Sequence, residues 1–85
     1  MKAAVFHGSG RPLSVEEIPT PRPGPGEVLI RVAGCGVCHT DLHYIDHGTP
    51  TFKEPPVVLG HEISGIVEQV APDVTSLGVG DRVLV

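Results

Sequence analysis

The chain has 85 residues and a net charge of −4 at pH 7, with no cluster of lysine or arginine. A chain of this length forms one small domain that buries a little over ~60% of the surface of its unfolded state. The acidic balance argues against nucleic acid or an anionic membrane as a partner, and no apolar run approaches the ~20 residues of a membrane span. These features predict a single domain, residues 1–85, in the cytoplasm.

Eleven glycines and nine prolines separate short runs of valine, isoleucine and leucine. This pattern is typical of strands joined by turns. We expect strands at 2–7, 13–18 (at a sheet edge), 27–33, 57–59 (buried), 63–70 and 81–85. A short helix is expected from 38 to 46, because apolar residues three apart follow polar residues that can begin a helix. The sequence therefore predicts a mainly β fold with one short helix.

Metal-ligating side chains gather in two places. The segment 34–43 brings two thiols, two imidazoles, a hydroxyl and a carboxylate directly after the 27–33 strand, and His61-Glu62 follows another apolar run. Zinc prefers thiolate and imidazole ligands, and a catalytic zinc site keeps one position open. Cys38 and His61 are the best candidates. Their wide separation differs from the close pairs of structural zinc sites and favours an open site.

Simpler interpretations stand beside this one for the cysteines. Cys35 and Cys38 form a C-x-x-C motif, which also occurs in thiol redox proteins. No second pair exists to complete a four-cysteine zinc site. Cys35 is more simply interpreted as a small apolar residue buried under the loop.

The remaining polar residues also have structural interpretations. Thr40 or Asp41 could cap the helix. Glu62 could be a solvated strand residue. The histidines of the expected helix could be exposed surface imidazoles: His39, His43 and His47.

No nucleotide-binding unit is visible in the chain. Gly-x-Gly triplets begin at positions 8, 24, 34 and 78, but none continues to a glycine or alanine three positions later. The dinucleotide-binding fingerprint is therefore absent.

Two motifs resemble one family. The run from Cys35 to His43 is similar to the catalytic-zinc loop of zinc-dependent alcohol dehydrogenases of the medium-chain superfamily. Gly60-His61-Glu62-x-x-Gly65, with Ala71 and Val74 further on, matches that family's zinc signature. The similarity extends over essentially the whole chain.

The resemblance implies a GroES-like, partly open β-barrel, incomplete in this chain, at the start of a catalytic domain. Family members have a third zinc ligand beyond the length of this chain, and a Rossmann cofactor domain later still. We therefore expect residues 1–85 to be the N-terminal part of a dehydrogenase without its cofactor domain.

The resemblance also implies metal-site roles. Cys38 and His61 would be zinc ligands, and Glu62 would lie beside the metal as an occasional ligand. Asp41 would orient a ligand.

Three residues of the expected helix would serve the reaction. Thr40 would accept the alcohol proton and pass it through the cofactor ribose to His43. His39 would contact the cofactor pyrophosphate.

The implied activity is NAD(P)-dependent interconversion of alcohols with aldehydes or ketones, with Zn²⁺ and NAD(P) as cofactors. We expect the 85-residue chain alone to lack turnover and to self-associate through open strand edges. The alternative is a stand-alone, non-catalytic β-barrel folding or zinc-binding module.

Overall fold

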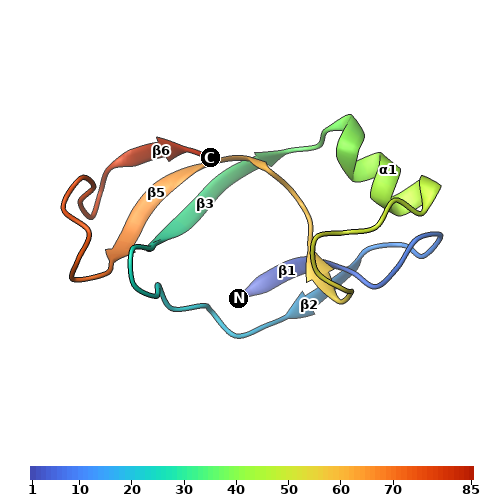
Figure 1. Ribbon diagram of the computed structural model, residues 1–85, viewed down its shortest axis with the longest axis horizontal. Coiled ribbons are helices and arrows are strands. Elements are labelled where there is room, and N and C mark those ends of the chain that lie inside the picture. The colour runs from blue at the N-terminus through green and yellow to red at the C-terminus, as the bar shows by residue number, and fades with distance from the viewer. The chain divides into compact units, whose positions relative to one another are not determined.

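The computed structural model describes residues 1–85. Its elements (Figure 1) are β1 (Lys2–Phe6), β2 (Ser14–Glu17), β3 (Val28–Gly36), α1 (His39–His47), β4 (Val57–Val58), β5 (Glu62–Val70) and β6 (Arg82–Leu84). The strands form two three-stranded sheets, and neither closes into a barrel. The predicted fold class, mainly β with one short helix, is confirmed. No helix is long and apolar enough to cross a membrane.

The chain divides into two compact units, which we describe one at a time. The first contains Met1–Pro19 and Val37–Gly60, and the second contains Thr20–Gly36 and His61–Val85.

The first unit is built on β1. This strand lies between β2 and β4 and is antiparallel to both. Its last two residues, Val5 and Phe6, form the core and are only 5% and 3% exposed. β2 pairs on one side only, so the predicted edge strand is confirmed.

The prediction of a buried strand over 57–59 is wrong in two respects. β4 has only two residues, and Val58 is 50% exposed. The reason is its position at a sheet edge, where only β1 covers it.

Hydrogen bonds within the first unit connect the segment after β1 to β2 and to the end of α1. Glu16 of β2 is hydrogen-bonded to His7, and this bond is the main cause that lowers the pKa of Glu16. The turn after β1 holds the end of α1: the Gly10 N–H donates to the Ile45 carbonyl at 2.8 Å. Ser9 Oγ accepts the Gly48 N–H at 2.9 Å. Gly48 ends the helix in a left-handed conformation.

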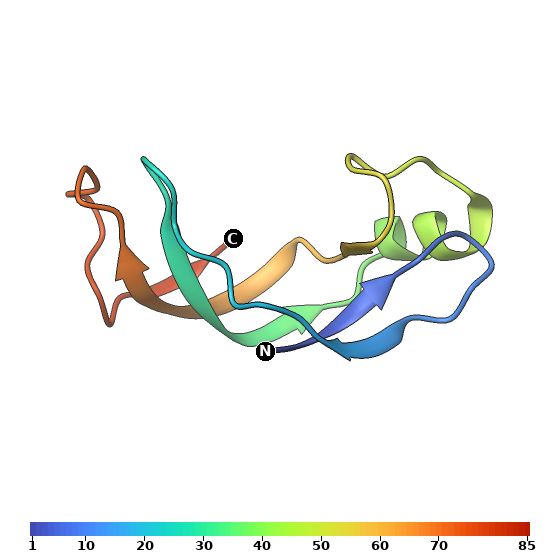
Figure 2. The ribbon, with the colours of Figure 1, turned by 90° about the horizontal axis from the view of Figure 1, so that it is seen from below.

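The second unit is an antiparallel sheet in which β5 lies between β3 and β6, as Figures 1 and 2 both show. Its buried residues are Val67 and Ala71.

β3 is longer than predicted. The strand was expected to end at Ala33, but it continues through Gly34, Cys35 and Gly36. A register shift after Val32 leaves Ala33 unpaired, and pairing then resumes. Such a bulge interrupts the alternation of side chains without ending the strand.

β3 and β5 approach each other closely at Gly65. A Cβ atom there would lie 2.5 Å from the Arg31 carbonyl oxygen and 2.5 Å from Ile30 Cγ2. Any side chain at position 65 would push the two strands apart.

We expect Gly65→Ala to lower the free energy of unfolding by about 1–3 kcal/mol, the usual cost of forcing extra volume into packed structure. Urea denaturation measures the loss. Gly78→Ala is the matched control, because no atom lies within 4 Å of a Cβ at that position. Equal unfolding midpoints for the two variants would contradict the close approach.

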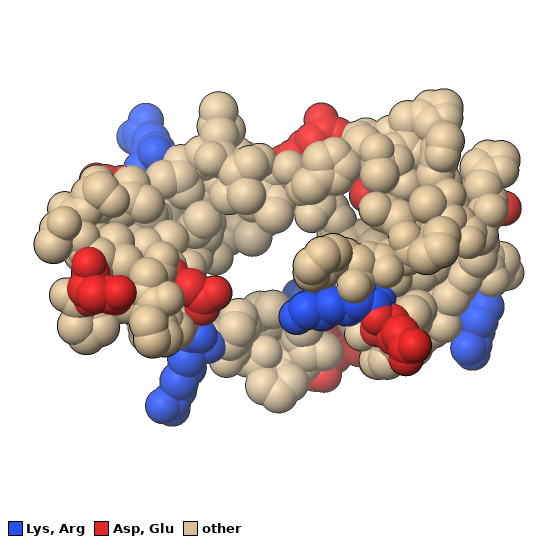
Figure 3. Space-filling model, in the orientation of Figure 1, with Lys and Arg blue, Asp and Glu red and all other residues tan.

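Charged side chains are scattered over the face seen in Figure 3. Acidic and basic groups alternate there with larger neutral areas. That face offers no continuous basic surface.

Candidate metal centre

The last pair of the β3–β5 ladder joins the two motifs found in the sequence. Gly36 pairs with Glu62. His61 directly precedes Glu62, and Cys38 follows Gly36 by two residues, which is at most about 7 Å along the chain. The register therefore keeps both motifs at one end of the ladder. The candidate metal ligands near this end are the Cys38 thiol, the His61 imidazole and the Glu62 carboxylate.

The Glu62 side chain lies over Gly36. A Cβ atom on Gly36 would be 3.2 Å from Glu62 Cβ and 3.5 Å from its Oε1. The glycine therefore leaves room for the carboxylate. The sequence alone does not single out Gly36, because its one signal is its position opposite the second motif, which depends on the register.

Cys38 begins helix α1. Its backbone is extended, with φ −117° and ψ 167°, and its Sγ accepts the Thr40 N–H at 3.3 Å. Cys38, and not Thr40, is therefore the N-cap residue, whereas Asp41 takes part in the cap as expected. The sulfur of a candidate metal ligand lies at the amino end of the helix, where the exposed N–H groups favour negative charge.

Asp41 completes the cap from the other side. Its Oδ2 accepts the Cys38 N–H at 3.1 Å, which makes a capping box. The residue is only 7% exposed. Its carboxylate therefore fixes the backbone of Cys38.

The histidines of α1 follow one another along the helix. The ring centroids of His39 and His43 are 4.6 Å apart, and those of His43 and His47 are 5.3 Å apart. All three are exposed. Thr40, also exposed, precedes His43 by three residues, a spacing at which helical side chains are neighbours.

Cys35 is exposed, so the prediction that it packs under a loop is wrong. It belongs to the extension of β3 and pairs with Ile63. Neither cysteine is in a disulfide.

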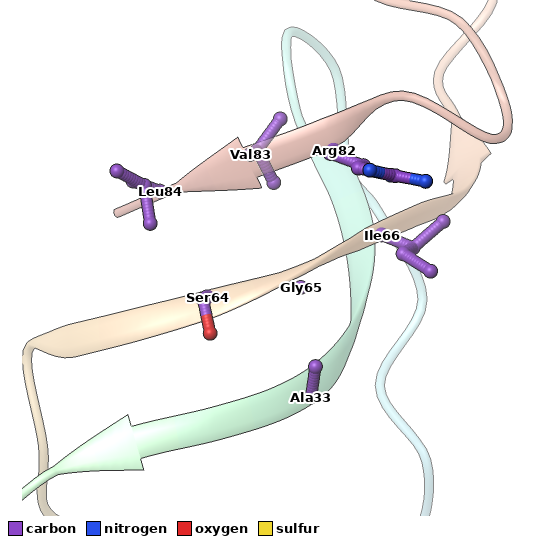
Figure 4. Close-up of a pocket in the computed structure, with 7 residues that line it drawn as sticks. All are labelled: Ala33, Ser64, Gly65, Ile66, Arg82, Val83 and Leu84. Carbon is purple, nitrogen blue, oxygen red and sulfur yellow. The ribbon is translucent and has the colours of Figure 1, made fainter.

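A separate apolar groove of about 330 Å³ lies on the second unit (Figure 4). Its walls come from β3, β5 and β6 and include Ala33, Gly65 and Val83. None of the candidate site residues lines it.

We expect Asp41→Ala to destabilise the protein by about 1 kcal/mol, because it removes one half of the capping box. Asp46→Ala is the matched control, since Asp46 is an exposed carboxylate in the last turn of the same helix. The helical circular dichroism signal and the thermal midpoint report the difference. A loss no larger for Asp41→Ala than for Asp46→Ala would show that the cap contributes nothing.

The fold and the site define a mainly β domain that carries thiol, imidazole and carboxylate side chains at the end of one strand pair. Residues 24–85 match the model of the alcohol dehydrogenase GroES-like domain, and the chain belongs to this family. The family predicted from the sequence is thereby confirmed.

Individual relatives agree with this assignment. An alcohol dehydrogenase of Rhizobium meliloti is 49% identical over 83 residues, which cover 98% of this chain and 24% of that protein. The structure of a thermostable alcohol dehydrogenase from Pyrobaculum aerophilum with cobalt and zinc bound matches with a TM-score of 0.91 and 42% identity. The matched region covers 100% of this chain and 26% of the Pyrobaculum aerophilum chain.

A structure described as a zinc-binding dehydrogenase from Sinorhizobium meliloti 1021, bound to NADP, matches with a TM-score of 0.85 and 38% identity. The matched region covers 95% of this chain and 23% of the Sinorhizobium meliloti chain. The chain thus spans about a quarter of the length of the relatives it matches.

Proposed function

We propose that this chain is the N-terminal, zinc-binding part of an NAD(P)-dependent alcohol dehydrogenase, which interconverts alcohols with aldehydes or ketones by hydride transfer. The pairing of Gly36 with Glu62 supports the proposal, because it brings the segment that resembles the catalytic-zinc loop and the segment that matches the zinc signature to one end of a ladder. The cofactor domain is not among residues 1–85, and the proposed location is the cytoplasm.

Cys38, His61 and Glu62 are the proposed zinc ligands. One thiolate, one imidazole and one carboxylate are donors that zinc accepts, so this set fits the metal. The Cys38 sulfur lies at the amino end of α1, where it accepts the Thr40 N–H. When bound, zinc supplies a Lewis acid that makes the alcohol hydroxyl more acidic. Asp41 holds the Cys38 backbone and so orients this ligand.

Thr40 and His43 are the proposed proton path. The Thr40 hydroxyl would accept the proton of the alcohol. With the cofactor bound, His43, one turn further along the same helix face, would receive that proton through the cofactor ribose and release it to solvent. Both side chains are exposed, so water reaches the path.

His39 is the proposed contact to the cofactor pyrophosphate. It is the first residue of α1, where the positive end of the helix favours an anion. The nicotinamide, when bound, supplies the hydride acceptor.

The chain alone is proposed to self-associate. β2, β4, β3 and β6 each pair on one side only, so their other edges present unpaired backbone groups. Such edges favour pairing with another chain.

We expect native mass spectrometry of the chain to show one zinc per chain and a dimer or higher assembly. Cys38→Ser is expected to lose the zinc and keep the helix, because serine is a good N-cap but lacks the thiolate. Cys35→Ser is the matched control and is expected to retain zinc. Zinc loss in Cys35→Ser but not in Cys38→Ser would overturn Cys38 as the ligand, and a purely monomeric spectrum would rule out self-association.

With NAD and a primary alcohol, we expect no NADH from the isolated chain, since no dinucleotide fingerprint is present. Absorbance of NADH is the measurement, with a complete zinc-dependent alcohol dehydrogenase as the positive control. Steady NADH formation proportional to the chain's concentration would refute the proposed lack of turnover.

A further inference from the structure

Helix α1 carries a second set of potential metal ligands. His39, His43 and His47 are four residues apart, which gives two overlapping His-x-x-x-His pairs. Residues four apart lie on one helix face, and two histidines at this spacing can chelate one ion. The proposed zinc site uses none of these imidazoles as ligands.

The ring separations fit chelation. With metal–nitrogen bonds of about 2.0–2.1 Å, two imidazoles on one ion have centroids roughly 4.5–5.2 Å apart at angles between about 90° and 109°. The measured separations are 4.6 Å for His39 and His43, and 5.3 Å for His43 and His47. The centroid separations are therefore compatible with one ion bound by either pair.

Helix electrostatics select between the two pairs. His39 is the first helical residue, where the positive end of the helix opposes a cation, whereas His47 lies in the last turn, where the carbonyl ends attract one. The exposed carboxylate of Asp46 adds negative charge at the same end. The pair formed by His43 and His47 is therefore favoured.

The backbone of this helix end is held in place. Ser9 Oγ donates to the Ile45 carbonyl at 3.0 Å and accepts the Gly48 N–H at 2.9 Å. A fixed backbone reduces the ordering cost of binding.

We propose that His43 and His47 bind one divalent transition-metal ion at the exposed carboxyl end of α1, with water in the remaining positions. Imidazole suits zinc, copper and nickel, and nickel binds nitrogen sites more tightly than cobalt or iron. This site goes beyond the proposed function, and its test needs neither substrate nor nicotinamide cofactor.

The test is titration of Ni²⁺ by calorimetry into the 85-residue chain carrying Cys35→Ser, Cys38→Ser and His61→Gln. This background removes the thiols and the proposed zinc site while serine preserves the helix cap. Adding His47→Gln is expected to weaken Ni²⁺ binding at least tenfold, since loss of even an outer partner of a metal ligand costs about 10–100-fold. His39→Gln, on the same helix face, is the matched control and should change the affinity by less than about twofold.

An unchanged Ni²⁺ affinity in His47→Gln would overturn the proposal. An equal loss in His39→Gln would overturn the choice of the carboxyl-end pair. Thermal unfolding gives a second readout, because an ion that binds only the folded helix raises the thermal unfolding midpoint of the protein. Saturating Ni²⁺ is expected to raise the midpoint of the background protein and not that of His47→Gln; no shift in the background protein would also overturn the site.

Discussion

The register between β3 and β5 is the constraint on which the rest of this structure depends. Gly65 allows the two strands to approach, and the bulge at Ala33 lets pairing continue to Gly36. A slip of one residue would turn every β5 side chain to the opposite face. Glu62 would then point away from Gly36, and the two motifs would no longer meet at the end of the ladder. The candidate chemistry therefore rests on backbone contacts some distance from it.

Beyond the ladder, the local geometry of the site comes from a helix cap. Cys38 accepts from the Thr40 amide, and Asp41 accepts from the Cys38 amide. Capping requires only an acceptor and a carboxylate at the right spacing. The proposed metal chemistry requires the same two groups, so one arrangement satisfies both needs. The capping box therefore positions the Cys38 and Asp41 side chains through local hydrogen bonds, without the need for a large core.

The sequence predicted the elements well wherever local pattern decides them. The β1, β2 and β5 strands follow from short apolar runs separated by turn residues. The errors lie where distant contacts decide. Cys35 is exposed because β3 extends past a bulge that only its pairing with β5 reveals. Val58 is exposed because β4 lies at an edge.

The sequence proposed the candidate site as a set of residues but not as an arrangement. The motifs pointed to Cys38, His61 and Glu62, whereas the capping role of Cys38 was missed because threonine and aspartate are commoner caps. That role has a chemical consequence. Oxidation of Cys38 to a sulfinic or sulfonic acid would replace the sulfur acceptor of the Thr40 amide with bulkier, charged oxygens. The first turn of α1 would have to rearrange to accommodate these oxygens. The oxidation state of one thiol would therefore change the backbone geometry at the start of the helix.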